Sequence, residues 1–295
     1  MHMNMGDLGE RITGQRDGNA PSARRGHTFR TAQRPHHSGG NLEIHLFRSV
    51  AVKGGGGCVS PYSEPARCLL TALAWHSNQV VSDAVVIQQI WGEEPPQHPR
   101  ASLYTCATRL RNAIQQADEA AAPGLLRRVC GGYLLAVDPE AVDVHRFRAL
   151  VRRARAYASY GEDEAAVDLY DRALAVAGDL PLPGLSSSWA AQARTGLHRE
   201  LRSARVGRAE IGLRLGLHVE DTPALHRLAE DHPLDEQVAG LLMTVLYRAG
   251  RQQEALLHYA ALRDRLVAEL GSEPGEELQL LHLRVLRRDP TLHRS

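Results

Sequence analysis

The amino-acid sequence predicts an α+β region over residues 41–140 followed by an all-α region over residues 141–295. In the first region, short segments that alternate apolar and polar residues are interspersed with segments of helical periodicity. From residue 142 to residue 289, alanine, leucine, arginine and glutamate recur at helical spacing with almost no strand pattern. A chain of 295 residues is long enough for two domains that each bury a core.

Residues 1–40 are rich in glycine, arginine, histidine, serine and proline, and they contain few large apolar side chains. Such a segment buries too little surface to offset the entropy of ordering, so we expect a disordered tail. Its six arginines outnumber its three acids and favour attraction to DNA, although a tail without function fits equally well.

The ordered part begins with a small antiparallel sheet. Residues 42–47 alternate apolar and polar, residues 50–53 form a second short strand, and the glycine run 54–57 supplies the turn between strands. This run lacks the Gly-Lys-Ser/Thr ending of a phosphate-binding loop, so it predicts no nucleotide site.

Two helices follow the sheet. Ser63, Glu64 and Pro65 indicate the capped start of a helix that runs to about His76. Residues 80–81 form a short strand, and residues 82–83 then cap a second helix that ends near residue 91.

The third helix carries the first candidate site. Leu103, Ala107, Leu110 and Ile114 lie on one face of a helix because their spacing follows its 3.6-residue period. The remaining surface offers groups that bond phosphates and base edges. The predicted DNA-contacting residues here are Arg100, Ser102, Tyr104, Thr105, Thr108, Arg109, Arg111 and Asn112.

A basic β-hairpin follows this helix. Residues 125–129 and 133–137 alternate as strands, and Gly131 with Gly132 supplies the turn. The hairpin is expected to place Arg127 and Arg128 against a neighbouring minor groove. The whole order predicts an α+β winged helix-turn-helix of the response-regulator type with an N-terminal β-sheet. A solvated helix beside an ordinary surface hairpin remains the alternative.

The charge is unevenly distributed. The net charge of +1 does not itself indicate nucleic-acid binding, but residues 98–135 contain five arginines and two acids. A local basic patch of this kind is typical of a focused DNA-binding surface. Lys53 is the only lysine, which suits bidentate contacts by arginine or simply reflects GC-rich codons.

The all-α region contains one internal repeat, in which a glycine, an alanine and a tyrosine recur with identical gaps. The repeat consists of Gly161, Ala166 and Tyr170, matched by Gly250, Ala255 and Tyr259. Small residues where paired helices touch are typical of tetratricopeptide-like helical repeats. The alternative is a generic helical bundle. Trp189, Leu197, Leu201 and Leu213 are expected in its core rather than around a pocket.

The sequence does not predict an enzyme, a metal site or a cofactor. Its 15 histidines form no H-E-x-x-H motif, and no G-x-S-x-G surrounds a serine. The serines 186–188 are better explained as a helix cap. Cys58, Cys68, Cys106 and Cys130 lack zinc spacing and are expected to be reduced and mostly packed. The chain lacks a membrane-spanning apolar run and a signal peptide, so a cytoplasmic location is expected.

Segments that match the sequence pattern of one protein family occur in both regions. They are 80–82 (VVS), 90–96 (IWGEEPP), 100–114, 132–135 (GYLL), 142–147 (VDVHRF), 232–234 (HPL), 241–243 (LLM), 246–252 (LYRAGRQ), 254–256 (EAL), Tyr259 and 270–278. Through these segments, residues 41–290 resemble the Streptomyces antibiotic regulatory protein family of transcriptional activators. The resemblance extends to its bacterial transcriptional activator domain.

The resemblance implies an activator of secondary-metabolite biosynthesis genes. Such a protein binds tandem direct repeats near the promoter −35 region as side-by-side protomers and recruits RNA polymerase with its sigma factor. Thr105, Arg109 and Arg111 then correspond to DNA-contacting positions, and Arg127, Arg128 and Gly132 to the wing. The implied polymerase-facing loop comprises Trp91, Gly92, Glu93, Glu94, Pro95 and Pro96.

Two positions depart from the family pattern. Tyr104 and Cys106 stand where the family more often has glutamine and tyrosine, which leaves the target sequence open. A repressor with the same DNA-binding fold, or a protein-binding scaffold of helical repeats, remains an alternative. Neither a receiver domain before residue 41 nor a P-loop ATPase module after the helices is expected.

Overall fold

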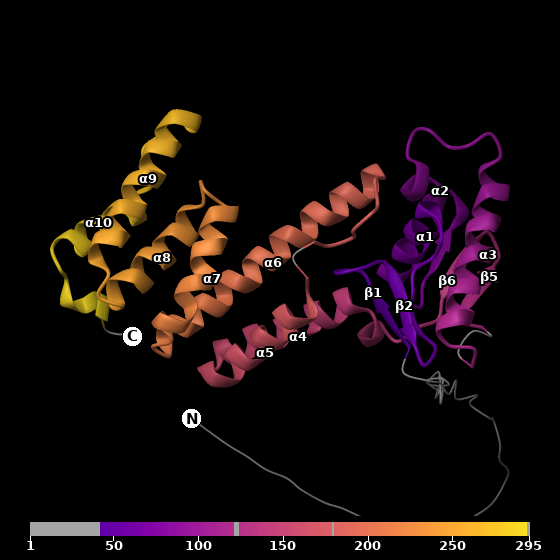
Figure 1. The fold of residues 1–295 in the computed structure, drawn as a ribbon, viewed down its shortest axis with the longest axis horizontal. Helices are drawn as coiled ribbons and strands as arrows, with labels where there is room; N and C mark the ends of the chain where they lie inside the picture. The colour runs from indigo at the N-terminus through magenta and orange to yellow at the C-terminus, as the bar shows by residue number, and fades with distance from the viewer. Residues whose placement is uncertain (1–41, 121–123, 179, 294–295) are drawn as a thin grey trace, which may run out of the picture. The chain divides into compact units, whose positions relative to one another are not determined.

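The computed structural model describes residues 42–120, 124–178 and 180–293. The tail predicted over residues 1–40 lies outside them. Figure 1 shows small sheets together with helices in the first part of the described chain, and helices after them.

The N-terminal sheet has three antiparallel strands, β1 (Glu43–His45), β2 (Ala51–Gly54) and β3 (Gly57–Val59). Ile44 pairs with Val52, and both side chains are fully buried. The predicted sheet is therefore present, and β3 is an additional strand that follows the glycine turn.

Helix α1 (Glu64–Trp75) begins after Ser63, as predicted, but the Ser63 hydroxyl makes no capping bond. The second helical position is Pro65, which has no N–H to donate to such a cap. At α2 (Asp83–Trp91) the predicted cap is confirmed, because the Ser82 side chain accepts a bond of 3.3 Å from the Val85 N–H.

The second sheet joins β4 (Val80–Ser82), β6 (Gly132–Leu135) and β5 (Leu126–Val129) in that order. Helix α3 (Pro99–Ala117) lies between β4 and β5 in the sequence. The hairpin turn falls at Cys130 and Gly131, so the predicted turn over Gly131 and Gly132 is wrong by one residue. Gly132 is instead buried in β6, where its Cα faces the backbone of Val81.

The rest of the described chain is helical: α4 (Asp143–Ser159), α5 (Asp163–Val176), α6 (Ser188–Arg214), α7 (His218–Asp231), α8 (Glu236–Arg248), α9 (Gln252–Leu270) and α10 (Glu276–Leu286). The internal repeat marks two packed helical pairs, α4 with α5 and α8 with α9. Gly161 and Gly250 form the turns, with φ of +78° and +76°, a conformation that glycine adopts readily. Ala166 and Ala255 are fully buried.

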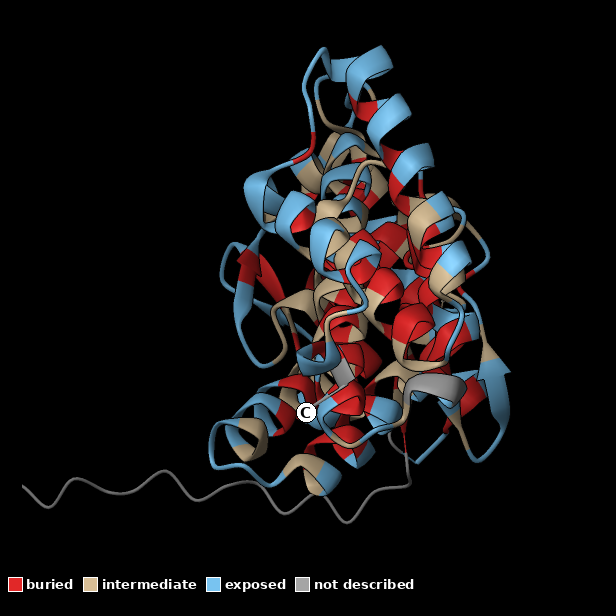
Figure 2. Ribbon diagram, turned by 90° about the vertical axis from the view of Figure 1, so that its left-hand side faces the viewer, coloured by how far each residue is buried: buried red, intermediate tan, exposed pale blue. Residues whose placement is uncertain are grey.

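Two clusters of buried apolar residues form the core, and helix α6 contributes to both. The first cluster includes residues from Leu42 to Ile211, and the second includes residues from Val206 to Leu292. Figure 2 shows the buried positions gathered in the interior of the described chain. Leu197, Leu201 and Leu213 are core residues as predicted, and Trp189 packs edge-on against Trp75.

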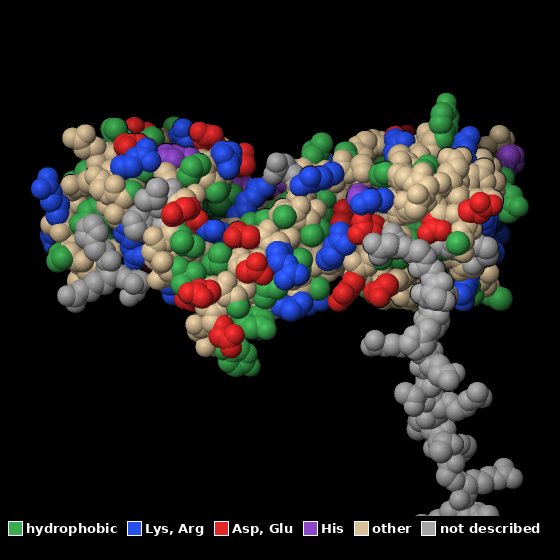
Figure 3. All heavy atoms as spheres, turned by 60° about the horizontal axis from the view of Figure 1, so that its bottom comes forward, with side chains coloured by type: hydrophobic (Ala, Val, Ile, Leu, Met, Phe, Trp, Pro, Cys, Tyr) green, Lys and Arg blue, Asp and Glu red, His purple; other side chains and the backbone are tan. Residues whose placement is uncertain are grey.

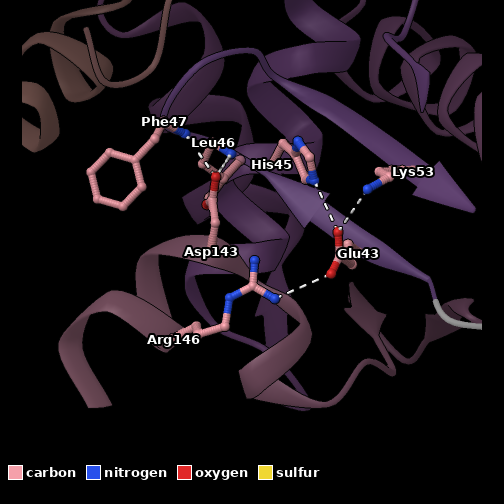
Figure 4. Close-up of polar contacts among 7 residues, drawn as sticks. All are labelled: Glu43, His45, Leu46, Phe47, Lys53, Asp143 and Arg146. Carbon is pink, nitrogen blue, oxygen red and sulfur yellow. Dashed lines mark hydrogen bonds and ion pairs between the residues drawn. The ribbon is translucent and has the colours of Figure 1, made fainter. Parts of the chain in front are cut away.

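The first cluster joins the N-terminal sheet to the helical region, because the start of α4 packs beside this sheet (Figure 4). Asp143 is 5% exposed, and its Oδ2 accepts bonds from the N–H groups of Leu46 at 2.8 Å and Phe47 at 3.0 Å. Burial raises the pKa of this carboxyl, and the two N–H donors oppose that shift. Beside it, Arg146 of α4 pairs with Glu43 of β1 at 3.2 Å.

The segment before α6 packs on the same helices and strands. The Leu182 N–H donates to the Leu46 carbonyl at 2.8 Å. Glu64 of α1 accepts two bonds of 2.6 Å from Ser186, one from its N–H and one from its hydroxyl. Ser187 caps α6, as the serine cluster predicted, by accepting a bond of 3.2 Å from the Ala190 N–H.

The four cysteines divide evenly between core and surface. Cys68 and Cys106 are buried, while Cys58 and Cys130 are exposed, and all four are free thiols. The expectation of mostly packed cysteines therefore holds for two of them. Burial raises the pKa of Cys68 to about 11, so that thiol stays protonated well above neutral pH.

Gly132→Ala is expected to destabilise the fold by about 1–3 kcal/mol, because the new methyl group meets the Val81 backbone and forces β4 and β6 apart. Urea denaturation measures this change. Gly55→Ala is the matched control, because a Cβ at Gly55 meets nothing within 4 Å. Equal stability of both variants would contradict the close approach of β4 and β6.

Asp143→Ala is expected to cost about 1–3 kcal/mol for each of the two buried N–H groups left without an acceptor. The free energy of unfolding, again from urea denaturation, tests this expectation. Asp264→Ala, at an exposed position of α9, serves as control. A loss below about 0.5 kcal/mol, the range of ordinary surface substitutions, would contradict the role given to Asp143.

Candidate nucleic-acid interface

Helix α3 has the two faces that its periodicity predicts. Leu103, Ala107, Leu110 and Ile114 are each at most 1% exposed. Cys106, Ala113 and Ala117 widen this buried face. The helix packs on α1, on α2 and on the N-terminal sheet, so its other face is presented outward from a rigid support.

The predicted DNA-contacting residues of α3 are on its outward side. Ser102 and Arg111 are half-buried, and the other six are exposed, namely Arg100, Tyr104, Thr105, Thr108, Arg109 and Asn112. Tyr104 is 66% exposed, so its ring lies on the surface of the helix. The helix therefore presents guanidinium, amide, hydroxyl and aromatic groups together.

The two threonines of this face already use their hydroxyl hydrogens. Thr105 donates to the Ala101 carbonyl at 3.2 Å, and Thr108 donates to the Tyr104 carbonyl at 3.1 Å. Each hydroxyl oxygen keeps its acceptor capacity. In this arrangement each threonine can still accept a hydrogen bond, whereas the arginines and Asn112 have N–H groups to donate.

The hairpin β5–β6 lies close to α3. Tyr133 of β6 is 2% exposed, and burial raises its pKa, while the positive charges of Arg128 and Arg111 oppose that shift. Arg111 of α3 therefore lies near enough to β6 to act on the Tyr133 hydroxyl. Arg111 of α3 and Arg128 of the hairpin therefore both lie within electrostatic range of the same buried tyrosine.

The two hairpin arginines differ in their contacts. Arg127 is exposed, and its Nε donates to the Gly124 carbonyl at 2.8 Å. Arg128 forms a two-bond pair with Asp83 and lies over the Tyr133 ring, 4.5 Å from its centroid. Its guanidinium also donates to the Gly132 carbonyl at 3.3 Å. Arg128 thus ties the hairpin to the start of α2.

Asp83 is the residue of this surface that sequence reasoning missed. The sequence marks it only as part of the predicted cap of α2, in whose first turn an acid is common. In the fold, hydrogen bonds from Arg128 are the main cause that lowers the pKa of Asp83. The Asp83 N–H also donates to the Gly131 carbonyl at 2.9 Å, which holds the hairpin turn against α2.

The acidic loop lies between α2 and α3. Gly92 adopts φ of +59° and ends α2, and its N–H donates to the Gln88 carbonyl at 2.9 Å. Glu93, Glu94 and Pro95 are exposed, and Pro96 is half-buried. Trp91 instead is the last residue of α2 and packs against the first core cluster. Its side chain therefore supports the start of the loop and is not part of the loop's exposed surface.

No group of three or more metal-binding side chains occurs among the described residues. None of the described helices is both long and apolar enough to cross a bilayer. Acidic and basic side chains are intermixed over the face seen in Figure 3.

Comparison with known proteins identifies the helical region. Residues 142–286 match the family model of the bacterial transcriptional activator domain. This match covers α4 to α10.

Curated relatives extend the similarity to most of the chain. Regulatory protein DnrI of Streptomyces peucetius is 31% identical over 86% of this chain and 95% of its own length. Transcriptional regulator RedD of Streptomyces coelicolor is 32% identical over 92% of this chain and 80% of its own length. Regulatory protein AfsR of the same species is 36% identical over 78% of this chain, but the match spans only 23% of AfsR.

A solved structure has the same fold. Mycobacterium tuberculosis EmbR, in complex with a low-affinity phosphopeptide, superposes with a TM-score of 0.78 at 25% identity, over 86% of this chain and 68% of EmbR. The similarity to DnrI and RedD covers the α3 surface and the helical region together. The chain therefore belongs to the Streptomyces antibiotic regulatory protein family of transcriptional regulators.

Proposed function

We propose that this regulator binds specific promoter DNA through a winged helix-turn-helix over residues 41–140 and activates transcription of antibiotic biosynthesis genes. In this proposal residues 141–295 form a tetratricopeptide-like activator domain, and the protein acts in the cytoplasm at the nucleoid. The outward face of α3, with three arginines beside a basic hairpin, is the observation that carries the proposal.

Helix α3 is the proposed recognition helix. A major groove about 12 Å wide admits one α-helix, and each base pair presents a distinct set of donors and acceptors there. Arg109 is suited to the two acceptors of a guanine, and Asn112 to the donor and acceptor of an adenine. The exposed Tyr104 ring offers apolar contact to a thymine methyl group.

The hairpin is the proposed wing, and its two arginines have different roles in it. Arg127 is exposed and is the wing residue proposed to approach the phosphates or the minor groove. Arg128 is engaged with Asp83, so its main proposed role is to fix the wing beside α3. Gly132 contributes through close packing of β6 on β4.

The proposed operator is a pair of tandem direct repeats near the promoter −35 region. Two protomers in the same orientation then lie side by side, with recognition helices about 34–36 Å apart, one turn of the DNA helix. The exposed acidic loop after α2 is proposed to contact RNA polymerase or its sigma factor, because its carboxylates lie outside the basic surface of α3.

Arg109→Ala is expected to weaken binding to the operator by about 1–3 kcal/mol, because a guanidinium that contacts the DNA is lost while α3 keeps its buried face. Fluorescence anisotropy with an operator duplex, repeated over several salt concentrations, measures the change. Arg265→Ala, at an exposed position of α9, is the control. Unchanged affinity at moderate salt would remove Arg109 from the interface.

Replacement of Glu93 and Glu94 with alanine is expected to lower transcription from the target promoter while DNA affinity stays within about twofold, because surface substitutions remote from an interface change affinity little. Reconstituted transcription and anisotropy on the same DNA separate the two effects. A variant with Glu140→Ala and Glu164→Ala loses the same charge elsewhere. Equal loss of binding and transcription would contradict a polymerase-facing loop.

A further inference from the structure

Helix α10, in the yellow part of the chain in Figure 1, carries leucines on its inner and its outer side. Leu278 and Val285 are buried in the second core cluster. The outer side is apolar as well: the exposed fractions are 52% for Leu280, 43% for Leu283 and 48% for Leu286. A surface helix usually has a polar outer side, and several exposed leucines together are typical of a contact surface.

A charged residue lies at each end of this exposed face. Glu276, Leu280, Leu283 and Arg287 follow one another at intervals of four, three and four residues, so they form one stripe along the helix. Both charged residues are exposed, and neither forms an ion pair with a described residue. The stripe reads acid, leucine, leucine, arginine, with equal spacing on either side of its midpoint.

The other two arginines near the end of α10 are bonded within the chain. The Nε of Arg284 donates to Oδ2 of Asp289 at 3.0 Å. The Nε of Arg288 donates to Oε1 of Gln252 at 3.2 Å. Arg287 makes no side-chain bond to a described residue, so its guanidinium is available to a partner.

The same stripe in reverse order is complementary to it. Consider two copies of α10 packed antiparallel about a twofold axis midway between Leu280 and Leu283. Leu280 of each copy then lies level with Leu283 of the other, and Glu276 of each copy lies level with Arg287 of the other. A single contact buries the leucines of both stripes and pairs the charges at both ends.

We propose that this chain forms a twofold dimer through the stripe of α10, with a second copy of the chain as the partner. A parallel arrangement is excluded by charge, because it places Glu276 against Glu276 and Arg287 against Arg287. Residues 1–40 contain few large apolar side chains, so they do not match this face. One helix of 11 residues makes a small contact, so we expect a reversible dimer that forms with rising concentration.

This dimer differs from the proposed arrangement on tandem repeats. A twofold axis turns one protomer by half a rotation, whereas direct repeats take both protomers in the same orientation. Helix α10 packs on α8 and α9, and α3 packs on α1, α2 and the N-terminal sheet, so different residues make the two contacts. The proposal rests on α10 alone and does not depend on the DNA-binding function.

Sedimentation velocity of the full chain without DNA, over a wide range of concentrations, tests the dimer. A monomer–dimer equilibrium is expected. Glu276→Arg and Arg287→Glu are each expected to weaken dimerisation at least about tenfold, because each places like charges opposite one another. Glu164→Arg makes the same change of charge at an exposed position of α5 and is expected to dimerise as wild type.

The double variant Glu276→Arg with Arg287→Glu tests the antiparallel register. It exchanges the two charges, so both ion pairs form again in the antiparallel dimer, and association within about threefold of wild type is expected. Circular dichroism verifies the fold of each variant. A folded double variant that associates no better than the single variants would refute the antiparallel pairing.

A further variant tests the apolar part of the stripe. Leu283→Asp is expected to weaken dimerisation at least about tenfold, because a carboxylate is buried against Leu280 of the other copy. Leu257→Asp is the matched control, since Leu257 of α9 is 69% exposed and lies outside the stripe. A chain that stays monomeric up to millimolar concentration, or a dimer that Leu283→Asp and Glu276→Arg leave unchanged, would overturn the proposal.

Discussion

The burial of one carboxylate, that of Asp143, joins the two parts of this regulator. A buried acid is costly unless it is hydrogen-bonded, and here two backbone N–H groups that follow β1 satisfy one of its oxygens. The same site brings Phe147 edge-on against Phe47, with ring centroids 5.5 Å apart. The start of α4 is consequently part of the core that supports the N-terminal sheet.

This junction continues along α1 and into the start of α6. Arg148 of α4 bonds Glu200 of α6 and lies over the Trp75 ring of α1, 4.6 Å from its centroid. Ser186 and Ser187 hold the start of α6 against α1, where the Cys68 thiol lies within 3.5 Å of the Ser187 hydroxyl. The first core cluster therefore includes residues from both predicted domains, among them the buried face of α3 and residues of α4 and α6.

The proposed DNA-binding surface is likewise held in place by buried contacts on its inner side. The buried face of α3 packs on α1 and α2, and the hairpin is held at its base by the pair of Arg128 with Asp83. An exposed ion pair alone contributes little stability, but this one has two parallel bonds and a stacked tyrosine beneath the guanidinium. Its main effect is geometric, since it fixes the hairpin relative to the outward side chains of α3.

Local sequence determined the elements of this protein. The period of Leu103, Ala107, Leu110 and Ile114 identified the buried and outward faces of α3, and the glycine repeat located both helical turns, because these features depend on neighbours within a few residues. Tertiary structure alone decided which polar groups meet. Arg128 and Asp83 are 45 residues apart, and Asp143 is 97 residues from Leu46, so no local pattern records either contact. Such pairs form only when packed elements bring distant parts of the chain together: the first holds the hairpin to α2, and the second holds α4 to the residues that follow β1.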